Sequence, residues 1–297
     1  MTTKPLKIGI IGGTGLYDME GLTETRTCEV ETPFGAPSDP FMRGMLDGVE
    51  VFFLPRHGHG HRILPSEINN RANIFGFKKL GVERIISVSA VGSLRDDYRP
   101  RDVFLLDQYF DRTKDWRRHT FFGDGIVAHV AFGDPVCNEL RQHVYSAASA
   151  IAGTGKFSGV RVHNGGTYVN MEGPAFSTKA ESHFYRRCDF DVIGMTSLAE
   201  AKLAREAEIC YVPIAMVTDY DCWHETADPV TVEAIVGHLH ANAELAEAII
   251  RKVLPEAAAE RKCPCGEALK NSIITAPDRI PQATREALAP IVGKYVG

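Results

Sequence analysis

Two aspartates, Asp219 and Asp221, directly follow an almost unbroken apolar run from Ile209 to Val217. The run is too short to cross a membrane and is typical of a strand buried on both faces of a sheet. Because residues two apart on an extended chain point the same way, the two carboxylates are expected to point together. Open α/β sheets place ligands at this end of their strands. A helix cap or a solvated turn would also explain the pair, so other segments must distinguish these interpretations.

Four other segments place hydrogen-bond donors at the ends of predicted strands or at a helix start. The glycine-rich turn at residues 12–15 exposes backbone N–H groups, and a guanidinium after the strand at 49–54 offers a planar fork to phosphate. Each segment alone is compatible with a plain turn. Together they predict a dianion site opposite acceptors that suit an aminopurine edge. The donors are Thr14, Arg56, His57, Ser89, the Ala90 N–H and Thr196.

The elements that would position these residues alternate along the chain. This alternation predicts an α/β fold, a single domain over residues 1–297 with a mixed central sheet flanked by helices. Ser197 to Glu200 has the form of a capping box, so Ser197 is expected to cap a helix. Residues 107–128 are expected to form a long loop, and 160–171 a strand or hairpin. Strands are predicted at 6–11, 49–54, 84–88, 102–106, 191–194 and 209–217, and helices at 65–80, 138–152, 178–187, 197–207, 228–253 and 282–291.

The composition limits the possible partners. The 297 residues are 44% hydrophobic and 24% charged, which is ordinary for a globular protein with a substantial core. The net charge of −5 argues against nucleic acid as a partner, because phosphate backbones bind basic faces. The sequence contains no apolar run of membrane length and no basic-then-apolar leader. We therefore expect a cytoplasmic protein without a membrane partner.

Two familiar ligand motifs do not fit. The glycines at 9, 12, 13 and 15 lack the spacing of a dinucleotide fingerprint, which disfavours a nicotinamide dehydrogenase, and no Gly-Lys-Ser/Thr follows to make a P-loop. His57, His59 and His61 alternate as metal ligands can, but no thiolate or carboxylate lies within their cluster. The sequence therefore predicts no metal and no cofactor.

Taken together, these segments resemble the trimeric purine nucleoside phosphorylase family, and in particular its members that act on 5′-methylthioadenosine. The likeness covers about residues 7–253 in the family's order and leaves 254–297 as an extension. Two residues depart from the pattern: Ser89 stands where many relatives have threonine, and Ala175 replaces a larger residue. The matching motifs occupy residues 10–16, 32–35, 55–58, 69–73, 89–93, 171–177, 193–196 and 218–223.

The resemblance implies a role for each motif residue. The six donors named above would bind phosphate. Phe176, with Ser177 beside it, would stack on the purine, and Met195 would lie beneath the ribose. Asp219 and Asp221 would bind the base. The resemblance also implies a homotrimer or a pair of trimers forming a hexamer. Val232 and Ile235 would line a 5′-thiomethyl pocket, and His129 would reach into a neighbouring subunit's site.

The implied reaction is phosphorolysis of 5′-methylthioadenosine to adenine and 5-methylthioribose 1-phosphate, with phosphate as co-substrate. Asp219, protonated or acting through water, is the candidate acid for purine N7, and His57 is the other candidate catalytic residue. Carboxylates at 219 and 221 favour a 6-amino over a 6-oxo purine, because a 6-oxo group would leave them unpaired. The alternatives are a purine nucleoside or methylthioinosine phosphorylase, a phosphate-independent nucleosidase, and a non-catalytic binding module.

Seven cysteines are spread along the chain. Most stand singly in apolar or mixed surroundings, which is typical of a reducing compartment. The exception is Cys263-Pro-Cys265, which we interpret as free surface thiols. Some thermophilic relatives carry a C-terminal Cys-x-Cys and disulfides, so a stabilising disulfide is the alternative.

Overall fold

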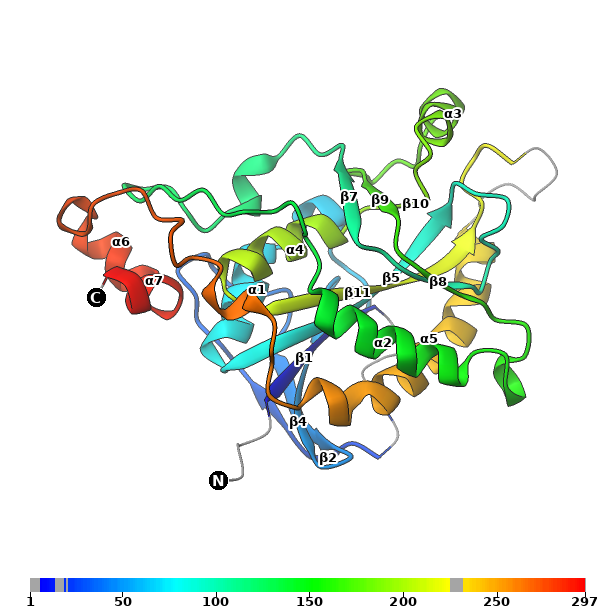
Figure 1. Cartoon of the computed structure of the whole chain (residues 1–297), viewed down its shortest axis with the longest axis horizontal. Coiled ribbons are helices and arrows are strands. Elements are labelled where there is room, and N and C mark those ends of the chain that lie inside the picture. Colours follow the sequence, from blue (N-terminus) through cyan, green and yellow to red (C-terminus); the bar gives the residue numbers. More distant parts are fainter. Residues whose placement is uncertain (1–5, 14–18, 20, 225–231, 297) are drawn as a thin grey trace.

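The computed structural model describes residues 6–13, 19, 21–224 and 232–296, with the side chains of residues 116–117 and 232–240 outside that description. Its centre is one mixed sheet, as predicted (Figure 1). The strands are β1 (Lys7–Gly12), β2 (Thr23–Cys28), β3 (Phe41–Leu46), β4 (Val49–Pro55), β5 (Val82–Ser93), β6 (Val103–Leu105), β7 (Gln108–Asp111), β8 (Val162–Asn164), β9 (Thr167–Asn170), β10 (Val192–Gly194) and β11 (Cys210–Asp219).

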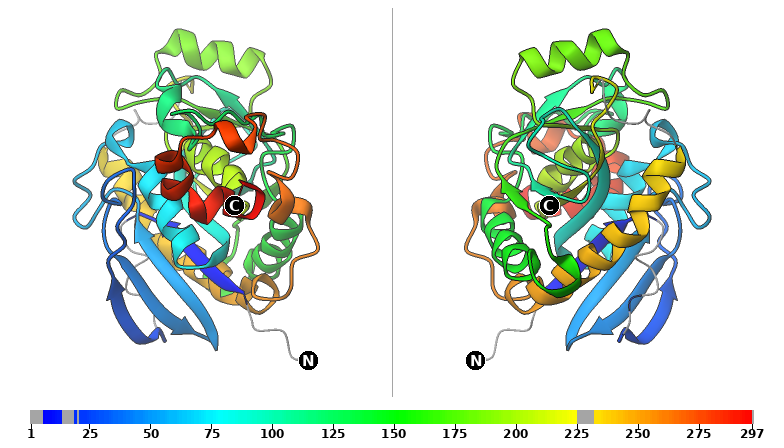
Figure 2. Two further views of the ribbon diagram at one scale, coloured as in Figure 1. Left: turned by 90° about the vertical axis from the view of Figure 1, so that its left-hand side faces the viewer. Right: turned by 90° about the vertical axis from the view of Figure 1, so that its right-hand side faces the viewer.

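Helices cover both faces of this sheet. α2 packs beside α5 on one face, and α1 packs beside α4 on the other. Figure 2 shows α3 standing apart from this body, at the end opposite the β2–β3 hairpin. The helices are α1 (Asn70–Lys79), α2 (Asn138–Ile151), α3 (Lys179–Arg187), α4 (Ser197–Glu206), α5 (Val232–Ala257), α6 (Gln282–Ala287) and α7 (Ala289–Val296).

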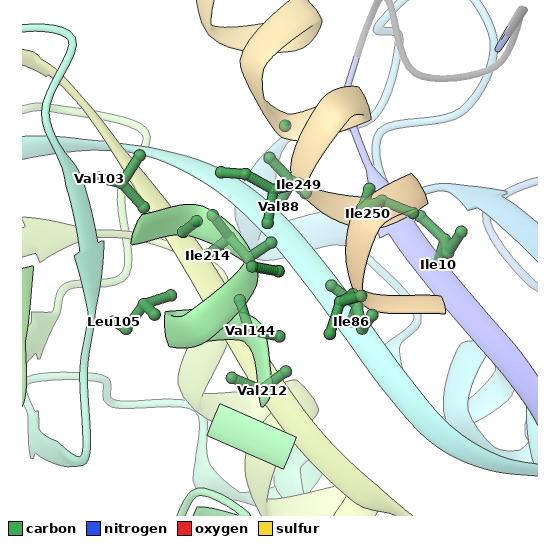
Figure 3. Close-up of a cluster of buried hydrophobic side chains, with 14 of the residues drawn as sticks. Ile10, Ile86, Val88, Val103, Leu105, Val144, Val212, Ile214, Ile249 and Ile250 are labelled. Atoms are coloured by element: carbon green, nitrogen blue, oxygen red, sulfur yellow. The ribbon is translucent and has the colours of Figure 1, made fainter. Parts of the chain in front are cut away.

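The central strands are apolar at successive positions because both of their faces are buried. Val212 in β11 and Ile10 in β1 contribute to the core beneath α2 and α5. Figure 3 shows Ile249 and Ile250 of α5 lying over this layer. A residue adjacent to each of these, Tyr211 or Ile11, points into the second core, beneath α1 and α4.

The sheet divides at the end of β5. The first part of β5 pairs in parallel with β1 on one side, and β11 pairs in parallel on the other side as far as Gly92. Its last residues, Gly92 and Ser93, pair in antiparallel fashion with β10. One branch then continues through β11, β6 and β8, and the other through β10, β9 and β7. We call this point the fork.

Most predicted elements are present, with four corrections. The strand predicted at 84–88 continues to Ser93, and β7 occupies part of the expected loop at 107–128. Residues 65–67 form a 3₁₀ turn and the helix begins only at Asn70, where Asn69 caps it by accepting a bond from the Ala72 N–H at 3.2 Å. β8 and β9 do not form a hairpin, because β8 pairs with β6 while β9 pairs with β10 and β7.

Among the described residues, no helix combines the length and the apolar character that a membrane span requires.

Candidate active site

A cavity of about 300 Å³ lies at the fork. Residues of β5, β10 and β11 form its floor, and the turn after β4, the start of α4 and the loop at 171–176 form its walls. Most sequence-predicted site residues meet here although they lie far apart in the chain. Those that line the cavity are Arg56, His57, Ser89, Ala90, Phe176, Met195, Thr196, Asp219 and Asp221.

Asp219 and Asp221 reach the cavity by a different backbone path from the predicted one. β11 shifts register between Val217 and Asp219, and Asp221 adopts a left-handed conformation with φ of 51°. The two residues therefore do not alternate on one extended strand, which corrects the sequence argument for their common direction. The Asp221 N–H donates to Asp219 Oδ1 at 2.8 Å, and the Thr218 hydroxyl donates to Oδ2 at 2.7 Å.

The two carboxyl groups differ in their surroundings. Burial, and after it the charge of Asp219, raises the pKa of Asp221 above its ordinary value. Asp219 is held by the two hydrogen bonds just described. Both groups can therefore act as hydrogen-bond acceptors. Asp221 takes up a proton more readily than a free aspartate does.

Gly92 provides the space for these acids. A Cβ atom at this position would lie 2.9 Å from Asp219 Oδ1 and 3.2 Å from Ile193 Cγ2. Any side chain larger than hydrogen would therefore displace the carboxylate or the neighbouring strand β10. The absence of a side chain at the fork allows Asp219 to lie against β5.

A buried ion pair between Arg56 and Glu200 supports the cavity wall formed by the turn after β4 and the start of α4. Arg56 is 2% exposed and Glu200 of α4 is 1% exposed. Arg56 Nε donates to Glu200 Oε1 at 2.5 Å, and Nη2 donates to Ser87 Oγ at 2.6 Å and to Glu200 Oε2 at 3.4 Å. Nη1 donates to the Val88 carbonyl at 3.1 Å. Burial lowers the pKa of Arg56, but the Glu200 carboxylate outweighs burial, so the net shift is upward.

The ion pair changes the role expected for Arg56. Its Nε and Nη2 groups bind Glu200 and are not available to an anion as a planar fork, although Arg56 lines the cavity; phosphate binding by Arg56 stays a prediction. One Nη1 N–H remains for a ligand. The charge is already balanced, and neutral donors must supply much of the binding of an anion.

The capping box predicted at Ser197 is wrong, because the Glu200 carboxylate that it requires binds Arg56 instead. Thr196 occupies the N-cap position, and Ser197 is the first helical residue. Ser197 Oγ lies 2.5 Å from the Tyr109 hydroxyl and 3.0 Å from that of Tyr211, which donates to Glu200 Oε2 at 2.8 Å. Glu200 therefore serves the buried Arg56 instead of the helix start. The sequence signal for this role was an acidic residue on a helix face that is otherwise apolar.

His57 is neutral in the free site. Its Nδ1 lies 2.8 Å from the Ile63 carbonyl, which can only accept, so Nδ1 carries the proton. Burial and the Arg56 charge lower the pKa of His57 to about 4. Its Nε2 is consequently an acceptor near pH 7, which corrects the expectation of a simple donor.

The side-chain donors on β5 and α4, Ser89 and Thr196, remain open to a ligand. Ser89 is buried, and its hydroxyl has no hydrogen-bond partner within the described part of the chain. Ala90 is exposed in a stretch of β5 that is otherwise mostly buried. The Thr196 side chain makes no capping bond among the described residues. A buried unpaired hydroxyl is costly unless a ligand or water satisfies it, so these groups indicate an anion site.

The remaining predicted residues divide into four groups. Phe176, 51% exposed, stands at the cavity mouth, with Met195 inside it. Ser177 is absent from the described lining, and its carbonyl accepts from the Cys222 thiol at 3.2 Å. His129 is exposed and is absent from the described lining. Thr14 lies outside the described residues, as do the side chains of Val232 and Ile235.

Comparison with known proteins gives one consistent result. A family model described as the phosphorylase superfamily matches residues 7–255. The S-methyl-5′-thioadenosine phosphorylase of Geobacter sulfurreducens is 56% identical over 289 residues, covering 97% of this chain and 99% of that protein. The protein of the same name from Koribacter versatilis is 58% identical over 291 residues, covering 98% and 97%.

Solved structures agree with these relatives. A methylthioadenosine phosphorylase sourced from an antarctic soil metagenomic library has a TM-score of 0.90 and 45% identity, covering 97% of this chain and 99% of that one. The methylthioadenosine phosphorylase of Schistosoma mansoni in complex with adenine has a TM-score of 0.82 and 36% identity, covering 89% and 96%.

Replacing Glu200 tests the ion pair. Glu200→Ala leaves the Arg56 charge buried without its partner and is expected to lower the free energy of unfolding by about 3–5 kcal/mol. The double variant Arg56→Met/Glu200→Met, which removes both charges, is expected to lose less than Glu200→Ala. Denaturant unfolding at one protein concentration measures both. A loss below about 1 kcal/mol in Glu200→Ala would contradict this account.

The low pKa of His57 predicts a dependence of stability on pH. Because the folded pKa of about 4 lies below the ordinary 6.5, folding favours the neutral ring. This contribution is fully present above pH 6.5 and is lost as pH falls toward 4. Between pH 7 and 4.5, wild type should lose about 2 kcal/mol more stability than His57→Asn, which cannot be protonated. His59→Asn, in the exposed part of the same turn, is the control and should behave as wild type.

Proposed function

The chain belongs to the phosphorylase superfamily, and we propose that it cleaves 5′-methylthioadenosine with phosphate, yielding adenine and 5-methylthioribose 1-phosphate. The observation that carries this proposal is the pairing, within one cavity, of two carboxyl groups with a set of open anion donors. The names of the relatives above support the same substrate. The products would return to purine and methionine salvage.

Base recognition rests on Asp219 and Asp221. Carboxylate oxygens accept from the exocyclic amine of adenine, whereas a 6-oxo purine would oppose them with another acceptor. An unpaired buried acceptor costs about 1–3 kcal/mol, which favours adenine over hypoxanthine by roughly 5–150-fold. Phe176, at the cavity mouth, is in place to stack on the base.

Phosphate would bind opposite the acids. Ser89 Oγ, the Ala90 N–H, Thr196 and the remaining Arg56 N–H are its donors, and the start of α4 adds the positive end of a helix dipole. Neutral His57 would accept a hydrogen bond from the hydroxyl of hydrogen phosphate. Thr14, by its place after β1, would complete this set.

The bond between C1′ and the purine breaks as positive charge develops on the sugar. Bound phosphate stabilises that charge and attacks C1′, so the donor set acts mainly by positioning. The leaving purine needs a proton or a hydrogen bond at N7. We assign this role to Asp219, beside the carboxyl of Asp221, whose pKa is raised.

The sugar and its 5′ substituent would occupy the apolar part of the cavity. Met195 lines the space assigned to the ribose. Val232 and Ile235 of α5 are proposed to surround the 5′-methylthio group, because an apolar side chain suits a thioether better than a hydroxyl. A histidine at position 232 would instead favour nucleosides with a free 5′-hydroxyl.

We further propose a homotrimer, alone or paired as a hexamer, in which His129 completes the neighbouring site. His129 is exposed and lies on a segment whose Val127 is 49% exposed. Ile274, 65% exposed, lies against this segment and donates its N–H to the Val127 carbonyl at 2.9 Å. An exposed apolar pair beside an exposed polar residue is typical of a subunit contact.

Adenine release from 5′-methylthioadenosine, with and without phosphate, tests the reaction. We expect release to depend on phosphate and to be faster than with 5′-methylthioinosine or adenosine. Release at the same rate without phosphate would identify a hydrolase on this scaffold. Preference for the 6-oxo substrate would contradict the roles of Asp219 and Asp221, and no turnover would leave a binding module.

Mixed oligomers test the role of His129. His129→Ala and Asp219→Asn are each expected to be nearly inactive. If His129 acts in the neighbouring subunit, an equal mixture, unfolded and refolded together, should recover about a quarter of the wild-type sites, each combining an intact Asp219 with a neighbour's intact His129. Separately refolded proteins, combined afterwards, are the control. Absence of recovery in the co-refolded oligomers would place His129 outside the neighbour's site.

A further inference from the structure

Four of the seven cysteines converge at one point away from the cavity. The sulfur atoms of Cys137, Cys210, Cys263 and Cys265 all lie within 4.8 Å of one another. Cys137, Cys210 and Cys265 are buried and Cys263 is partly buried. Both expectations from the sequence are therefore corrected: Cys137 and Cys210 are not isolated core residues, and the Cys263-Pro-Cys265 thiols are not simple surface groups.

Three distant segments supply these thiols. Cys137 is the N-cap residue of α2, and Cys210 is the first residue of β11. Cys263 and Cys265 flank Pro264 at a 3₁₀ turn in the C-terminal segment, beyond the residues that the family model matches. The Cys137 N–H donates to the Tyr211 carbonyl at 3.0 Å, which fixes the start of α2 against β11.

We propose that these four thiolates bind one structural Zn²⁺ ion. A tetrahedral site with zinc–sulfur distances of about 2.3 Å places its sulfur atoms roughly 3.8 Å apart, within the range observed here. Four sulfur ligands select zinc or iron over the hard cations Mg²⁺ and Ca²⁺. Because all four positions would be filled by protein, the ion has no open position for substrate, so its role is structural. The sequence predicted no metal, since it compared only the histidines at 57–61.

Disulfide bonds explain the arrangement less well. The sulfur atoms of Cys210 and Cys263 are 3.2 Å apart, beyond the S–S bond length of about 2.05 Å. Two separate disulfides would require the sulfur atoms to be close only within each pair, whereas all four lie close to one another here. A zinc ion accounts for the convergence of all four.

The surroundings suit the negative charge of a tetrathiolate site. Thiolates are favoured at helix N-termini, and Cys137 is placed at that of α2. Arg261 lies beside the Cys210 sulfur and donates from Nη1 to the Glu208 carbonyl at 3.0 Å. This guanidinium therefore joins the two segments that carry ligands and partly balances the charge of a zinc ion with four thiolates.

The site lies at the opposite end of β11 from the cavity. Cys210 and Asp219 are nine steps apart along the strand, roughly 30 Å. The ion would fasten the C-terminal segment to β11 and α2. Beyond Cys265 that segment continues to Ser272, which accepts from the His129 N–H at 2.9 Å. Loss of the metal should therefore loosen the C-terminal segment before it affects the central sheet.

Metal analysis of the whole protein is the test. Protein purified under reducing conditions, without chelator, should contain about one zinc per chain by elemental analysis. Cys265→Ser should contain much less, and Cys188→Ser, which removes an exposed thiol elsewhere, should retain it. Chelator under denaturing conditions, followed by refolding with Co²⁺, should give the visible absorption of tetrahedral cobalt bound by thiolates.

Three results would overturn the proposal. One is a reduced chain that neither contains zinc nor takes up one equivalent on titration. Another is a denatured, unreduced protein in which fewer than seven thiols react with alkylating agent, because this would indicate disulfides. The third is zinc retained in both Cys265→Ser and Cys210→Ser. If the proposal is right, removing the metal should also lower the melting temperature by about 10 °C and speed proteolysis at residues 258–280.

Discussion

The buried ion pair between Arg56 and Glu200 is the interaction on which the site depends. A buried charge costs several kcal/mol unless it is paired and hydrogen-bonded, so Arg56, directly after β4, requires α4 to approach with its carboxylate. Ser87 of β5 and Tyr211 of β11 complete the network, which therefore joins four elements. The approach of α4 brings Thr196 to the same cavity as Ser89. Convergence of the anion donors is thus a consequence of satisfying one buried guanidinium.

The fork in the sheet is the second constraint. β11 stays paired with one edge of β5 as far as Gly92, while on the other edge β10 takes the place of β1, and the cavity lies where these strands meet. Gly92 stands at the point of divergence and lacks the side chain that would displace Asp219. The register shift after Val217 and the left-handed backbone at Asp221 then direct both carboxylates into the same space. A regular β11 would have placed these acids differently.

The sequence predicted the central strands and most site residues because apolar runs, glycines and polar strand ends are local signals. It did not predict that Glu200 would bind Arg56, since this contact joins residues 144 positions apart and a local capping pattern offered a simpler explanation. It also placed the end of β5 too early, because Ser89 to Ser93 reads as a turn when its pairing with β10 is unknown. The tautomer of His57 depends on the Ile63 carbonyl, a contact set by the fold of the turn. Local patterns therefore identified the participants, and long-range pairing determined their roles.

The two ends of β11 would then have separate functions. Its carboxyl end carries the acids, and its amino end begins at Cys210, beside three thiols that the sequence presents as unrelated residues. The proposed completion of an active site by a neighbour's His129 would require that the segment carrying His129 be held in place. That segment is paired with Ile273 and its neighbours, in the stretch of chain that follows Cys263 and Cys265. A metal ion there would act on the C-terminal segment first and on the neighbour's site through it. Zinc content should therefore affect stability and subunit assembly more than the chemistry of a single intact site.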